Sequence, residues 1–301
     1  MTTTNSVSEK ESIAARLMQR LMHDAGVPRV DFRAPAKEQA LVGPDSLSWR
    51  VFKNPVALFI GGVTAVLLEL AEPRVRSGVW DHTSFRTDSL PRMKRTGLAA
   101  MVTVYGARSV AEKMIAGVNR MHGHVAGVTP DGAAYQASDP ELLDWVQATA
   151  SFGFLEAYAA FVTPLSTADK DRFYAEGASA AALYGAVGAP RSLAEQQKQF
   201  AAMRPKLERS DIVFEFLDIM GRTKILPLPF HPLQGMFIRA GAEILPSDIR
   251  TMLGLDDWRL KPWEKKLVQW AGAVSDKVRI PGTPAVQACE RLGLPANYLY
   301  R

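Results

Sequence analysis

A helix predicted over residues 88–104 carries basic and small side chains on one face, because they recur at i, i+3 and i+4. That face is formed by Arg92, Arg95, Thr96, Ala99 and Thr103. Guanidinium groups donate paired hydrogen bonds to anionic oxygens, and the small side chains beyond them leave space for a flat ligand. The pattern therefore predicts a binding face, with a solvated basic helix end as the alternative.

A second helix, predicted over residues 107–126, directs one histidine inward and another outward. The inward ridge has a spacing of four residues and consists of Val110, Met114, Val118 and His122. His124 aligns instead with the polar side of the helix. An inward imidazole is suited to metal ligation when it is neutral, and the alternative is a hydrogen-bonded core histidine.

Several short motifs around these helices occur in an order typical of one family. They are Gly78, Asp81-His82-x-x-Phe85, Arg92-x-x-Arg95-Thr96, His122-x-x-Val125-x-Gly127, Gly132-x-x-Tyr135-x-Ala137 and Asp139-Pro140-Glu141-Leu142-Leu143-x-Trp145-Val146. Over roughly Phe52 to Arg291, the chain resembles the rubber oxygenase (latex clearing protein) catalytic domain. This family includes the fungal endoplasmic-reticulum oxygenase of mycophenolic acid synthesis.

The resemblance implies a mostly helical fold with a globin-like core around haem b. His122 would be the proximal ligand of the iron, and Arg92, Arg95 and Thr96 would line the distal, catalytic side. Characterised members of the family cleave carbon–carbon double bonds of isoprenoid chains with dioxygen.

The chain departs from the family pattern at two places. Gln147 stands where many relatives have a histidine. Rubber-cleaving members also use a glutamate upstream of the arginine motif. Glu69 and Glu72 are the acidic residues nearest to that place, so the sequence leaves the choice between them open.

Composition indicates one large helical domain. The chain has 301 residues, 47% hydrophobic and 22% charged, and its apolar periodicity is helical almost throughout. We therefore predict an all-α fold, with an N-terminal helical arm over residues 1–45 and the catalytic domain over 46–301. The arm, with an amphipathic helix over 9–25, is expected to pack across the domain or against a second subunit, which would make a homodimer.

Charge and apolar patterning limit the partners and the location. The net charge is +5, with no basic run interleaved with aromatic residues, so no nucleic-acid partner is expected. The longest apolar run, Pro55–Leu68, is shorter than the roughly 20 residues of a membrane-spanning helix. We expect a buried core helix there and no stable membrane insertion. The polar N-terminus and the single Cys289 favour a cytoplasmic location.

The leading hypothesis is a haem-dependent oxygenase or oxidase. It would act on a small apolar substrate, isoprenoid-like or a natural product, with dioxygen or peroxide bound to iron on His122. The chain lacks the nucleotide-binding glycine motifs, the Cys-x-x-Cys and His-Glu-x-x-His zinc motifs, and Gly-x-Ser-x-Gly. Two alternatives remain open, namely a haem or lipophile carrier without turnover, and a helical scaffold in which His122 is a core residue.

Overall fold

The computed structural model describes residues 28–226 and 231–301, and within them the chain is almost entirely helical. The elements in chain order are α2 (Leu47–Phe52), α3 (Pro55–Ala71), α4 (Pro73–His82), α5 (Ser89–Tyr105), α6 (Arg108–His122), β1 (Ala126–Val128), β2 (Ala134–Gln136), α7 (Pro140–Phe161), α8 (Thr167–Leu183), α9 (Leu193–Met203), α10 (Asp211–Arg222), α11 (His231–Glu243), α12 (Ser247–Leu253), α13 (Pro262–Lys277) and α14 (Pro284–Arg291), with short 3₁₀ turns at Arg204–Lys206, Asp256–Trp258 and Tyr298–Tyr300. The predicted helix over 9–25 lies outside the described residues.

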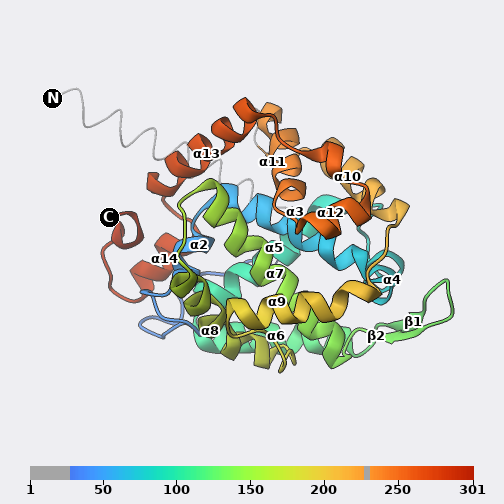
Figure 1. Ribbon diagram of the computed structural model, residues 1–301. Coiled ribbons are helices and arrows are strands. Elements are labelled where there is room, and N and C mark those ends of the chain that lie inside the picture. The colour runs from blue at the N-terminus through green and yellow to red at the C-terminus, as the bar shows by residue number, and fades with distance from the viewer. Residues whose placement is uncertain (1–27, 227–230) are drawn as a thin grey trace.

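The predicted all-α class is confirmed. The two strands found in the described part of the chain have three residues each and form one antiparallel hairpin, in which Gly127 pairs with Tyr135. The hairpin projects from the edge of the molecule near α4 (Figure 1). The helix predicted over 107–126 ends earlier, at His122, because residues 126–128 pair with 134–136 instead.

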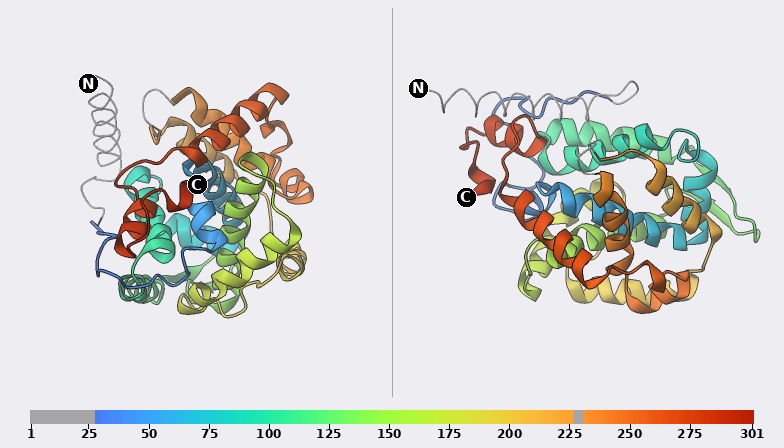
Figure 2. Two further views of the ribbon diagram at one scale, coloured as in Figure 1. Left: turned by 90° about the vertical axis from the view of Figure 1, so that its left-hand side faces the viewer. Right: turned by 90° about the horizontal axis from the view of Figure 1, so that it is seen from above.

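The centre of the fold is the crossing of α3 and α7, around which the other helices are arranged (Figures 1 and 2). The two helices approach closely at Gly61 and Gly153. A Cβ atom at Gly61 would lie 2.7 Å from the Cα of Phe154, and one at Gly153 would collide with the carbonyl oxygen of Gly61. Glycine at both positions therefore permits the backbones to touch.

The apolar run from Pro55 forms the predicted core helix. Asn54 caps α3, since its side-chain oxygen accepts hydrogen bonds from the backbone N–H groups of Val56 (3.1 Å) and Ala57 (3.0 Å). Most of its apolar side chains are buried. None of the described helices, taken singly, has the length and apolar content to cross a membrane. Among the described helices, only α3 and α4 taken together have this length and apolar content, and the two helices meet at a bend of 109°.

The described part of the predicted N-terminal arm is joined to the C-terminal helix. Phe32 is buried, and the guanidinium of Arg291 donates hydrogen bonds to the carbonyl oxygens of Phe32 (2.7 Å) and Glu38 (2.8 Å). Residues 28–46 therefore pack on the core of the molecule. The domain boundary at residue 46 and the homodimer stay predictions.

Candidate active site

The arginine motif lies in the first half of α5, and its three residues differ in exposure. Arg92 is half-buried, with its guanidinium 5.6 Å from the ring centroid of the buried Phe85. Arg95 and Thr96 are exposed. The Thr96 hydroxyl donates to the carbonyl oxygen of Arg92 (3.2 Å) and lies 3.4 Å from its guanidinium. The predicted binding face thus begins with one inward arginine and two residues open to solvent.

Farther along α5, the face of small side chains is closed at one end. The hydroxyl of Thr103 donates to the carbonyl oxygen of Ala99 (2.8 Å) and lies 2.9 Å from the Tyr184 hydroxyl, which follows α8. Tyr184 therefore covers this end of the face.

His122 is the last residue of α6 and is half-buried, whereas His124 is exposed. The Nδ1 atom of His122 is buried without a hydrogen-bond partner. Burial lowers the pKa of His122, so the imidazole is neutral at pH 7. The rest of its predicted ridge is also half-buried, while Ala111 and Ile115 are the fully buried residues of the helix.

A second buried polar atom without a partner lies next to His122 on the same helix. Asn119 precedes His122 by three residues, which places both side chains on one side of the last turn. Its Nδ2 donates to the carbonyl oxygen of Leu183 (2.8 Å), but its Oδ1 is buried and unpaired. The sequence analysis does not predict a role for Asn119, although its spacing of three residues from His122 is a signal that could have identified it. Unpaired buried polar atoms are costly, so this pair favours an additional ligand or partner here.

The arginine motif and His122 lie at the same end of a helix pair. The connection between α5 and α6 contains just Gly106 and Ala107, and the two helices pack on each other. The start of α5 follows α4 along the chain, and the end of α6 leads into the hairpin, which packs on α4. Both predicted parts of the site are therefore positioned around α4.

Glu69 of α3 is the acidic residue whose charge interacts with Arg92 of the arginine motif. The buried Thr149 of α7, whose hydroxyl donates to the carbonyl oxygen of Val146 (2.9 Å), also lies close enough to lower the pKa of Glu69. Burial raises the pKa of Glu69 to about 7, and the charge of Arg92 and the nearby Thr149 partly oppose this rise. The carboxyl group is therefore present in both protonation states near neutral pH.

Glu72, the other acidic residue upstream of the arginine motif, has a structural role. Its carboxylate caps α4 by accepting a hydrogen bond from the backbone N–H of Val75 (2.8 Å), and it forms an ion pair with Arg74 (2.7 Å). Both interactions hold the Glu72 carboxylate at the bend between α3 and α4. The structure thus separates a structural acid, Glu72, from one coupled to Arg92.

Other motif residues gather around Tyr135 and hold the hairpin on α4. A Cβ at Gly127 would lie 2.6 Å from the Tyr135 hydroxyl, so the ring crosses this glycine closely. The same hydroxyl is 3.0 Å from Nε2 of His82, and Gly78 lies against the other side of the ring. His82 is therefore locally hydrogen-bonded, and these residues support the end of α6.

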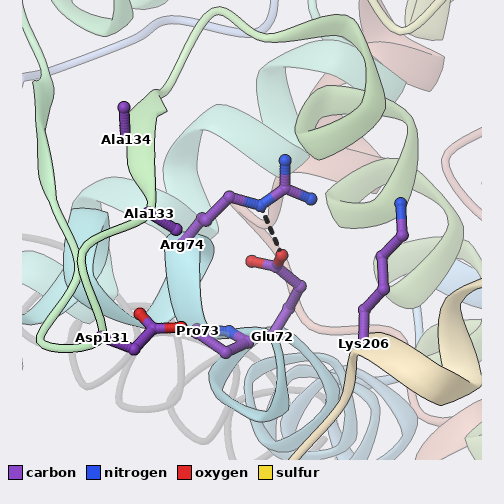
Figure 3. A pocket seen from close by; sticks show the side chains of 7 residues that line it. All are labelled: Glu72, Pro73, Arg74, Asp131, Ala133, Ala134 and Lys206. Carbon is purple, nitrogen blue, oxygen red and sulfur yellow. Dashed lines mark hydrogen bonds and ion pairs between the residues drawn. The ribbon is translucent and has the colours of Figure 1, made fainter.

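A surface hollow of about 350 Å³ lies beside the hairpin (Figure 3). Its lining is formed by Glu72, Pro73, Arg74, Asp131, Ala133, Ala134 and Lys206. Glu141 is held between two of these cations, since it pairs with Arg74 (2.7 Å) and with Lys206. The hollow thus contains charges already paired with one another, and of the candidate site residues only Glu72 lines it.

In this all-helical domain, the charge interaction between Glu69 and Arg92 and the neutral imidazole of His122 lie around α4. A family model described as "ER-bound oxygenase mpaB/B'/Rubber oxygenase, catalytic domain" matches residues 49–275. The chain belongs to this family, as its motifs predicted, and the family is one of oxygenases. No match was found among the curated proteins or among the solved structures.

Proposed function

We propose that this protein is a cytoplasmic, haem b-dependent oxygenase or oxidase. Its substrate would be a small apolar molecule, isoprenoid-like or a natural product, and its oxidant dioxygen or peroxide. The observation that carries the proposal is the charge interaction of Glu69 with Arg92 beside a helix pair that ends at His122, whose buried Nδ1 has no hydrogen-bond partner. The globin-like character of the core stays a prediction.

The residues present fit a haem group. A haem iron takes an axial ligand from a neutral imidazole, and His122 is neutral at pH 7 with a buried ring nitrogen that has no partner. Arg92, Arg95 and Thr96 would face the group from α5, where the arginines suit a propionate or a bound anionic oxygen. When bound, the haem would supply the redox chemistry with the oxidant.

Glu69 is suited to accept a proton from the substrate. A carboxyl group with a pKa of about 7 is partly ionised at neutral pH and is a stronger base than an ordinary glutamate. Arg92 and Thr149 both favour the ionised form of the carboxyl group. In this proposal, Glu69 would take the role of the upstream glutamate that the resemblance implies for double-bond cleavage.

A carrier without turnover is the second candidate function, and it would need no glutamate at the site. The coupling of Glu69 to Arg92 favours catalysis, because a carrier of haem or lipophile has no use for a base with a raised pKa.

The test is turnover by protein purified after expression with haem available. Oxygen uptake would be followed with an isoprenoid polyene, and carbonyl products would be trapped with a hydrazine. Uptake coupled to cleaved products supports an oxygenase. Haem binding without uptake, with either dioxygen or peroxide, would assign the carrier function instead. Protein that never binds haem would overturn the proposal.

A further inference from the structure

The outward face of α13 carries large apolar side chains in solvent. Trp263, Trp270 and Val274 are separated by seven and four residues, so they lie on one side of the helix. Their exposed fractions are 58%, 63% and 41%. The opposite side is buried at Val268 and at Gly272, where a Cβ would collide with the carbonyl oxygen of Phe161. The helix thus turns an apolar face to the protein and another to the outside.

The charges on this outward face are positive. Lys266 and Lys277 are exposed and lie beside the tryptophans by their helical spacing. The acidic residues of α13 point elsewhere: Glu264 is buried and pairs with Arg239, and Asp276 is half-buried and pairs with Lys53 (3.1 Å). α13 itself therefore places no carboxylate on this apolar and basic surface, which we call the α13 face (Trp263, Lys266, Trp270, Val274 and Lys277).

This composition suits the interface of a lipid bilayer. Tryptophan prefers the headgroup region, where its ring is partly buried and its N–H stays hydrated. Lysine near an anionic surface adds a favourable charge interaction while its aliphatic stem lies along the apolar layer. α13 has 16 residues, so it measures about 24 Å and is suited to lying in the surface rather than crossing it. It also occupies the outer edge of the molecule (Figure 1).

We propose that the α13 face docks peripherally on an anionic membrane surface. The two tryptophans insert among the headgroups, and Lys266 and Lys277 contact the lipid phosphates or carboxylates. An apolar substrate dissolved in the bilayer would then be concentrated near the protein. The inference stands on α13 alone and needs neither a bound haem nor turnover, so it can fail independently of the proposed function.

The test is flotation of the full chain with vesicles of phosphatidylcholine alone and of equal parts phosphatidylcholine and phosphatidylglycerol. The intact protein should float with the anionic vesicles and be released by high salt. The double variant W263A/W270A and the charge reversal K266E/K277E should each lower the bound fraction about tenfold or more. Lys198→Glu, an exposed lysine on α9, is the matched control and should leave binding nearly unchanged.

A second readout does not depend on substitution. Trp49, Trp80 and Trp145 are buried, so lipids brominated on their acyl chains should quench chiefly the exposed tryptophans of the intact protein. Absence of quenching and of flotation would overturn the proposal, as would equal flotation of W263A/W270A. A concentration-dependent dimer that W263A/W270A dissociates would assign the face to a second copy of the chain and also overturn it.

Discussion

Glu69 on α3 and Arg92 on α5 act on each other's ionisation. The charge of Arg92 lowers the pKa of the Glu69 carboxyl, and the carboxylate raises the pKa of the Arg92 guanidinium, each against a larger opposite effect of burial. The pair therefore combines a guanidinium that stays charged with a carboxyl group that titrates near pH 7.

The substitution Glu69→Gln should abolish the proton-accepting step while retaining haem. We expect kcat to fall by about 10²-fold or more, because that is the usual contribution of a general base. The wild-type pH–rate profile should rise through about pH 7. Steady-state rates across pH measure both effects. Glu72→Gln is the control: it should weaken the cap of α4 without moving the rise near pH 7, and a moved rise in that variant would contradict the assignment.

The raised pKa of Glu69 should also make the stability of the folded chain depend on pH. Its pKa is raised in the fold from 4.5 to about 7, so between these values the native state binds more protons than the unfolded state. The free energy of unfolding should therefore fall as pH rises from about 4.5 to 7 and change no further above that range. Relative to Glu69→Gln, the wild type should lose about 1–3 kcal/mol across this window. Urea titrations at several pH values measure the difference in unfolding free energy between the wild type and Glu69→Gln. A difference that stays constant across pH would contradict the raised pKa of Glu69.

The crossing of α3 and α7 should be intolerant of one methyl group. Gly61→Ala would place a Cβ against the backbone of Phe154, so we expect a loss of about 1–3 kcal/mol in unfolding free energy. Gly62 is the matched control, because a Cβ there has no neighbour within 4 Å. Gly62→Ala should stabilise the helix by up to about 1 kcal/mol. Urea denaturation distinguishes them, and equal effects would contradict the described crossing.

Arg92→Ala and Thr96→Ala should separate activity from cofactor binding. Both residues lie on α5 and would not ligate the iron, so haem should be retained better than in His122→Ala. Loss of the guanidinium leaves Glu69 without its positive neighbour, which raises the pKa of the carboxyl further and lowers kcat at pH 7. Haem titration beside steady-state kinetics checks this, and equal losses of binding and rate would speak against the division of roles.

Helical periodicity was sufficient to predict the class and many of the elements. The helices predicted from the apolar run that begins at Pro55 and from the spacing around Arg92 agree closely with α3 and α5. The end of α6 was placed too late, since Val125 continues the helical pattern and the pairing of β1 with β2 is a contact between separate segments. Local propensity contains no information about such a contact.

The site was predictable where its residues share a helix and not where they meet across the fold. Arg92 and Thr96 could be placed together by their spacing alone. Glu69 could not be preferred over Glu72, because the choice depends on Arg92 and Thr149, which lie on two other helices. The hydrogen-bond deficits of Asn119 and His122 likewise appear only when side chains are packed.

The central claim is that His122 ligates a haem iron, and the visible spectrum of haem-reconstituted variants tests it most directly. The wild type should show a Soret band, which His122→Ala should abolish or strongly shift. His124→Ala should retain it, because His124 is exposed. A wild-type spectrum in His122→Ala, with loss in a variant of another histidine, would contradict the assignment.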